Sequence, residues 1–89
     1  MTPQNQEIKV LQQRACRILS AWAQGRWEEL QSLIERPTEF PNSVHAREYT
    51  EAIGAVVVLL RVWLSAPEEV SIPQLQAASG LLRHLAGTI

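Results

Sequence analysis

The residues of this sequence that could do chemistry begin with His45, Glu48 and Glu51, which follow one another at intervals of three. On a helix this spacing places the three side chains along one side of successive turns. An imidazole beside carboxylates could bind a metal ion or transfer protons. However, no cysteine or second histidine lies at ligand spacing, and the order His-x-x-Glu reverses the Glu-x-x-His of di-iron bundles. We therefore interpret these residues as a solvated helix start and predict no metal site and no cofactor.

Cys16 is the single cysteine, so an intrachain disulfide is excluded and a reducing compartment is the simplest interpretation. A nucleophilic cysteine needs a nearby base and an electropositive setting. Arg14 and Arg17 are close in sequence, but residues at these distances point to different sides of a helix. We expect Cys16 to be a small buried hydrophobe.

Other catalytic and nucleic-acid signatures are absent from the sequence. It has no glycine-rich phosphate loop, no serine-centred elbow and no aspartate, so we predict that the protein is not an enzyme. The formal net charge is −1, and the basic residues are scattered along the chain. Because DNA and RNA binding depends on concentrated positive charge, we expect no direct contact with nucleic acid.

The three tryptophans, Trp22, Trp27 and Trp63, could line a ligand pocket, although tryptophan at such positions is more often part of the core. One alternative function is therefore a small-molecule or metal-binding bundle built around Trp22, Trp63, His45 and Glu48. Another alternative is a structural or chaperone-like subunit of a larger assembly.

The elements that must position these residues are all helical. We predict a single all-α domain over residues 1–89, a small bundle of three to four helices at about 3–24, 26–36, 43–66 and 72–86. The start signals are Thr2 before Pro3, Asn42 or Ser43, and a capping box formed by Ser71 and Gln74. The stop signals are Gly25, Pro37, Pro67 and Gly87.

The stretch from Trp22 to Leu30, with its aromatic-glycine-aromatic centre, resembles the hinge of a tetratricopeptide hairpin. No second copy follows at the period of a repeat array, so the resemblance implies only a tight helical hairpin. Residues 37–43 form a linker with two prolines around Phe40. We favour Phe40 as a lid over the core, and keep it as a candidate partner contact if its ring is exposed.

The helix predicted at 43–66 is more apolar than one small chain can cover. It holds six consecutive apolar residues, from Ala55 to Leu60, and its apolar arc is roughly 220°, about twice that of a surface helix. Its narrow polar stripe contains one apolar residue, Val58. We therefore predict that homodimerisation through this helix completes the bundle. The predicted interface residues are Ala55, Val58, Leu59 and Val62.

The first residues lack the basic start and apolar stretch of a signal peptide, and the apolar run is interrupted by Arg61 and too short to cross a bilayer. We therefore expect a cytoplasmic protein that does not enter the membrane.

In its size, helix order and the segment from Arg47 to Pro67, the chain resembles the small bacterial anti-activators of the QslA type, which are dimers of short all-helical subunits. The resemblance implies a regulator that sequesters a LuxR-type quorum-sensing transcription activator and prevents its dimerisation or DNA binding. It implies no catalytic residues.

Overall fold

The computed structural model describes residues 3–37 and 40–87, and within these ranges the chain is all-α. Thr2, the expected cap of the first helix, lies outside the described residues, as do Thr38 and Glu39 of the linker. The described elements are α1 (Pro3–Ala23), α2 (Trp27–Glu35), α3 (Arg47–Ser65), the short 3₁₀ turn η1 (Pro67–Glu69) and α4 (Ile72–Ala86). The predicted small helical bundle is therefore confirmed.

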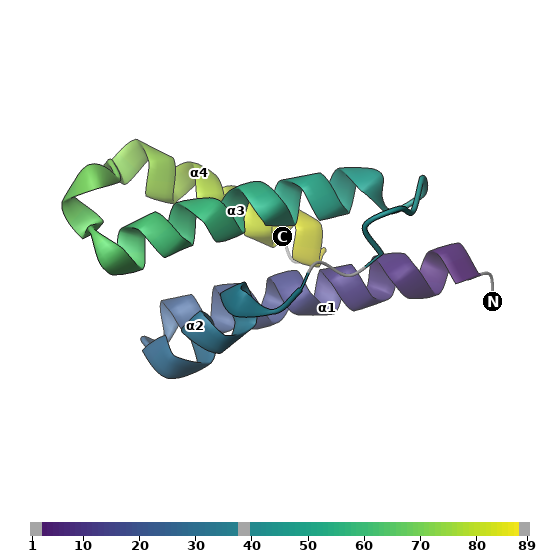
Figure 1. The fold of residues 1–89 in the computed structure, drawn as a ribbon, viewed down its shortest axis with the longest axis horizontal. Coiled ribbons are helices and arrows are strands. Elements are labelled where there is room, and N and C mark those ends of the chain that lie inside the picture. Colours follow the sequence, from purple (N-terminus) through teal and green to yellow (C-terminus); the bar gives the residue numbers. More distant parts are fainter. Residues whose placement is uncertain (1–2, 38–39, 88–89) are drawn as a thin grey trace.

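The helices form two hairpins that pack on each other. Figure 1 shows α1 and α2 as one hairpin and α3 and α4 as the other, with the linker joining them at one end. α1 contacts all three other helices, and its contact with α4 is the most extensive. The shared core consists of fully buried aliphatic side chains from every helix, the largest being Leu11, Ile18, Leu30, Ile34, Leu60 and Leu82.

The turn between α1 and α2 is set by Gly25, as predicted. Its φ of 71° lies in the left-handed region, which favours glycine because a side chain is strained there. The Gly25 N–H donates to the Trp22 carbonyl at 3.2 Å, and the Arg26 N–H donates to the Ala21 carbonyl at 2.9 Å. This pair of bonds is the Schellman motif, which satisfies the last carbonyls of α1.

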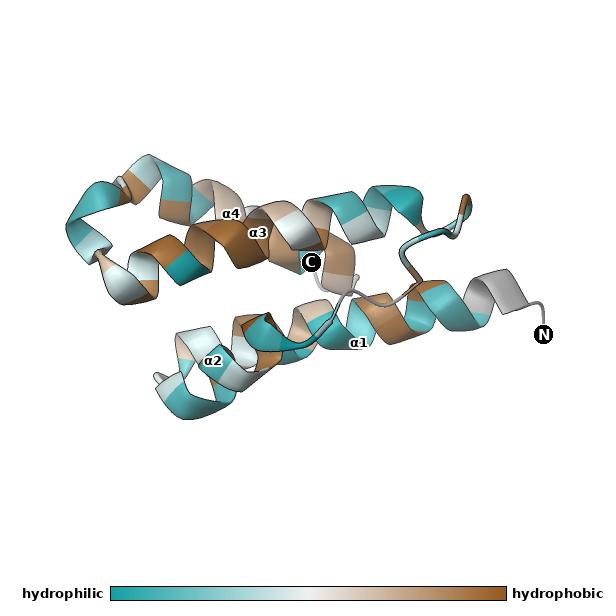
Figure 2. Cartoon of the chain, viewed as in Figure 1, coloured by the Kyte–Doolittle hydropathy of each residue, from teal (hydrophilic) through white to brown (hydrophobic). Residues whose placement is uncertain are grey.

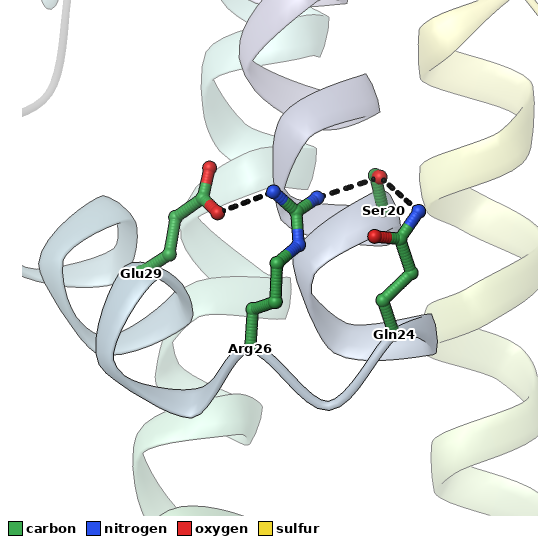
Figure 3. Close-up of polar contacts among 4 residues, drawn as sticks. All are labelled: Ser20, Gln24, Arg26 and Glu29. Atoms are coloured by element: carbon green, nitrogen blue, oxygen red, sulfur yellow. Dashed lines mark hydrogen bonds and ion pairs between the residues drawn. The ribbon is translucent and has the colours of Figure 1, made fainter.

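Polar side chains hold the outside of this turn. The Ser20 hydroxyl accepts hydrogen bonds from Arg26 Nη2 at 2.9 Å and from Gln24 Nε2 at 3.2 Å (Figure 3). The other end of the guanidinium forms an ion pair with Glu29 at 2.6 Å, in the first turn of α2. These exposed contacts link the end of α1 to the start of α2, although an exposed ion pair stabilises by at most about 1 kcal/mol.

α3 begins at Arg47, four residues later than the predicted start at residue 43. Ser43 does act as a cap, but its hydroxyl accepts from the Ala46 N–H at 3.2 Å and so closes a turn before the helix. The same hydroxyl donates to a Glu7 carboxylate oxygen on α1. Because this hydroxyl is tied to α1 and Ala46 is fully buried, the segment before Arg47 is held in an irregular turn.

α4 begins and ends where the sequence predicts. The Ser71 hydroxyl accepts from the Gln74 N–H at 3.3 Å, and the Gln74 Oε1 accepts from the Ser71 N–H at 2.9 Å, which completes the capping box. Gly87 ends the helix with a φ of 74°. Before α4, Pro67 starts the 3₁₀ turn η1, an element that the sequence interpretation did not include.

The expected burial of Cys16 is wrong. Cys16 is exposed, and the side chain that is buried beside the core is Arg14, which is 5% exposed. Its guanidinium donates to the carbonyls of Leu33 and Arg36 at 3.2 Å and of Pro37 at 3.3 Å. An arginine can be buried at this place because the end of α2 presents carbonyls that lack partners within the helix.

Candidate interaction surface

The outer face of α3, which we define as Ala55, Val58 and Val62, is the uncovered part of this apolar helix. All three are exposed, and the exposed fractions are 61% for Val58 and 37% for Val62. They recur at intervals of three and four, so they form one stripe along the helix. Figure 2 shows the apolar middle of α3 as a brown stretch of ribbon. The stripe is the place where the apolar arc exceeds what α1, α2 and α4 cover.

Leu59, the fourth predicted interface residue, lies at the border of this stripe. It is partly buried and packs against the core. Together with Ala55 it lines an open depression of about 290 Å³ between α3 and α4, to which α4 contributes Gln74, Ala77 and Leu81. The apolar surface therefore continues from the outer face of α3 onto the neighbouring side of α4.

Charged residues border the outer face of α3 along the helix. Arg47 and Glu51 form an ion pair at 3.1 Å in the first turns, with both side chains mostly exposed. Towards the other end, Arg61 Nη2 donates to the Ile34 carbonyl of α2 at 3.1 Å. An apolar centre bordered by charges is the usual anatomy of a protein–protein contact.

Gly54 lies next to this face, in the interior of α3. A glycine in a helix interior destabilises the helix by about 0.5–1 kcal/mol relative to alanine. A Cβ at this position would meet nothing within 4 Å, so the packing within the chain does not require a glycine.

Of the two alternatives for Phe40, the structure agrees with a lid that packs over the core. Its ring is partly buried and packs against the core, and its φ of 53° is the one positive value among the described non-glycine residues. The Phe40 carbonyl accepts from the Ser43 N–H at 3.1 Å, which closes a tight turn. Whether the exposed part of the ring contacts a partner stays a prediction.

The tryptophans pack on one another. The ring centroids of Trp22 and Trp63 are 5.9 Å apart, and those of Trp27 and Trp63 are 5.4 Å apart, both in edge-to-face arrangements. Trp22 also lines a groove of about 410 Å³ between α1 and α4, to which Trp27 and Trp63 do not contribute. The three residues therefore form a packed cluster at the turn between α1 and α2.

The structure does not bring this cluster together with His45 and Glu48. Glu48 lies in the first turn of α3 and Trp63 in its last, so the two are about 22 Å apart along the helix. Within residues 3–37 and 40–87, no group of three or more His, Cys, Asp or Glu side chains is arranged to hold a metal ion.

The sequence interpretation missed the arginines that contact the end of α2. Arg14 follows Leu11 by three residues and precedes Ala21 by seven, and both of these are fully buried. Stepping 100° per residue, Arg14 falls between them on the buried side of α1, whereas Cys16 falls outside that arc. The helical positions of Arg14 and Cys16 therefore predict their burial and exposure correctly. The residue types predict the opposite, because arginine is usually exposed and cysteine is usually buried.

Among the described helices, none combines the length and apolar character needed to cross a bilayer. Comparison with known proteins finds no match for this chain among protein-family models, curated proteins or solved structures.

Proposed function

We propose that the protein acts by protein–protein contact and that its first partner is a second copy of itself, bound through the outer face of α3. The observation that carries this proposal is Val58, a branched aliphatic side chain that is 61% exposed in the middle of a 19-residue helix. Pairing two such faces across a two-fold axis removes both stripes from water. Each fully buried valine contributes about 1.5–3 kcal/mol.

The total accessible surface of the chain supports the proposal that a partner covers part of it. Its accessible area is 5863 Å² for a mass of 10.0 kDa, whereas a folded monomer of this mass exposes roughly 5200 Å². The excess of roughly 600 Å² approaches the area that one subunit contributes to an interface of standard size, about 800 Å². An interface of that size through α3 and the adjoining side of α4 would bring the exposed area per chain to an ordinary value.

We further propose that the dimer is a regulator that sequesters a transcription activator of the LuxR type. This step depends on the resemblance to the QslA-type anti-activators in size, helix order and the segment from Arg47 to Pro67. A net charge of −1 with dispersed basic residues suits contact with a protein better than contact with DNA.

Analytical ultracentrifugation of Val58→Glu tests the dimer. A glutamate at this position places two like charges together in the buried centre of a two-fold interface, a penalty of several kcal/mol, so the variant should sediment as a monomer. Val44→Glu is the matched control, because Val44 is 82% exposed and lies before α3. A wild-type protein that is monomeric at micromolar concentration would contradict the dimer.

The regulatory step is tested separately with purified activator. In a pull-down the wild-type protein should retain a LuxR-type activator, and in a gel-shift assay it should release that activator from its DNA. The protein by itself should leave the DNA unshifted at physiological salt. Direct DNA binding without any effect on the activator would contradict the regulator but not the dimer.

A further inference from the structure

The outer face of α3 is not flat, because a pocket opens beside Val58. The pocket has a volume of about 190 Å³ and lies where α1, α2 and α3 meet. Along α3 its wall contains Thr50, Gly54 and Val58, which follow one another at intervals of four and so lie one turn apart. Gly54 adds no side chain to this wall, and a Cβ at its position would meet nothing within 4 Å. The outer face therefore has a projecting side chain at Val58 next to a hollow at Gly54.

The same face carries an acidic and a basic side chain on opposite sides of this centre. Stepping about 100° per residue, Glu51 and Arg61 lie within about 60° of Val58 around the helix, and both are exposed. They are about 15 Å apart along the axis, which is too far for an ion pair within one chain. Glu51 pairs with Arg47, and Arg61 donates to the Ile34 carbonyl through Nη2. A carboxylate accepts several hydrogen bonds and a guanidinium has five donors, so each group can bind a further partner.

The projecting side chain, the hollow and the two charges share one midpoint. Gly54 and Val58 are centred on the height of Val56, and so are Glu51 and Arg61. Val56 is also the middle residue of the 19-residue helix α3. A two-fold axis that lies in the interface, perpendicular to α3 at this height, places a second copy of the helix antiparallel to the first. Val58 of one copy then lies at the height of Gly54 of the other. Glu51 of one copy lies at the height of Arg61 of the other.

We propose that the dimer pairs α3 antiparallel in this register, an inference that rests on the dimer proposed above. Val58 of each copy packs over Gly54 of the other copy and enters the mouth of its pocket, so that the projecting side chains fill the hollows. Glu51 of each copy forms an ion pair with Arg61 of the other copy at the border of the apolar stripe. Because the axis crosses the middle of α3, the two helices overlap along their full length.

A parallel pair of the same helices lacks this complementarity. A two-fold axis along the helix direction places every residue at the height of its own copy. The two Val58 side chains then meet each other, and the two hollows at Gly54 stay unfilled. The two Glu51 carboxylates also come close together, and a like-charge contact across an interface is unfavourable. The charges of the outer face therefore favour the antiparallel orientation.

Disulfide crosslinking between different copies tests this register. The background is Cys16→Ser, so that the introduced cysteines are the only thiols. Chains with Glu51→Cys are mixed with chains with Arg61→Cys, refolded together so that subunits exchange, and oxidised. The mixture should form a covalent dimer, because a disulfide needs a Cα–Cα distance below about 7 Å and the register brings the two positions this close. Either variant alone should crosslink about tenfold less, since two copies of the same position are about 15 Å apart along the axis. Melting curves establish that each variant is folded.

Charge reversal gives an independent readout by sedimentation. Glu51→Arg should weaken the dimer about tenfold, because every dimer contains two copies of the ion pair with Arg61. The double variant Glu51→Arg/Arg61→Glu restores opposite charges between the two copies and should recover most of the wild-type affinity. Arg17→Glu, at an exposed position of α1, is the control and should dimerise like the wild type.

The outcomes separate the register from the dimer. The register is overturned by a dimer in which Glu51→Cys crosslinks by itself, or by one in which the mixture with Arg61→Cys stays uncrosslinked. It is also overturned if the double charge reversal is no tighter than Glu51→Arg. These results leave the dimer in place, whereas a wild-type protein that sediments as a monomer overturns the dimer and the register together.

Discussion

Replacement of Arg14 by methionine tests how the buried arginine stabilises the fold. Methionine keeps a long flexible apolar side chain at this position in α1 but removes the guanidinium. The carbonyls of Leu33, Arg36 and Pro37 then lose their donors from α1. Among the described residues, the Leu33 carbonyl then keeps one donor, the Arg36 N–H at the long distance of 3.4 Å.

The magnitude follows from the burial of these bonds. A buried hydrogen bond from a charged donor contributes about 1.5–3 kcal/mol, and the bond to Leu33 is the buried one. The carbonyls of Arg36 and Pro37 are part-buried and can bind water instead, so they add less. The substitution also removes the cost of burying a charged group, which offsets part of the free energy lost with the hydrogen bonds. We therefore expect a net destabilisation of about 2 kcal/mol.

Thermal unfolding measures this change directly. For 89 residues the unfolding entropy is about 0.19 kcal/mol/K, so about 2 kcal/mol lowers the melting temperature by roughly 10 °C. Arg17→Met is the matched control, since Arg17 lies on the exposed side of the same helix, and its melting temperature should fall by less than about 3 °C. Equal shifts for the two variants would refute the assigned role of Arg14.

Three other substitutions have defined outcomes in the same melting assay. Ser71→Ala removes the cap of α4 and should cost about 1 kcal/mol, or roughly 5 °C, and an unchanged midpoint would contradict the capping box. Gly25→Ala should cost about 1 kcal/mol because alanine is strained at a φ of 71°, and a stabilised variant would contradict the turn. Phe40→Ala should cost about 1–2 kcal/mol and leave the dimer intact, because the half-buried ring packs on the core. An unchanged melting temperature together with weaker activator binding would instead identify the ring as a partner contact.

The sequence predicts best those features that depend on local chemistry. The start of α4 depends on Ser71 and Gln74 within one turn, and its end depends on a glycine with positive φ, so nearby residues suffice to predict both. The turn at Gly25 follows from the same kind of signal. The surplus apolar surface of α3 was also predictable, because it follows from periodicity alone.

The features that the sequence could not predict depend on contacts between distant segments. α3 starts late because the Ser43 side chain contacts Glu7, which is 36 residues away. Arg14 is buried because the end of α2, at least 19 residues away, offers it carbonyls. The pocket of about 190 Å³ where α1, α2 and α3 meet has the same origin, since its lining residues are spread from Leu11 to Arg61 and meet only in the folded bundle.

The tryptophan cluster makes one end of the molecule visible to optical spectroscopy. Trp22, Trp27 and Trp63 come from α1, α2 and α3, and the ring centroids of Trp22 and Trp27 lie 5.9 Å and 5.4 Å from that of Trp63. At these distances the excited states of the rings couple and produce a paired signal in circular dichroism. The signal is present only while α1, α2 and α3 are docked. Trp27 is 48% exposed, so its emission also responds to a quencher in the solvent. No tryptophan lies in α4 or near the start of α3. The single tyrosine, Tyr49, lies near the start of α3. Comparison of its signal with the coupled tryptophan signal would therefore show whether the two ends of the bundle unfold in one step or in sequence.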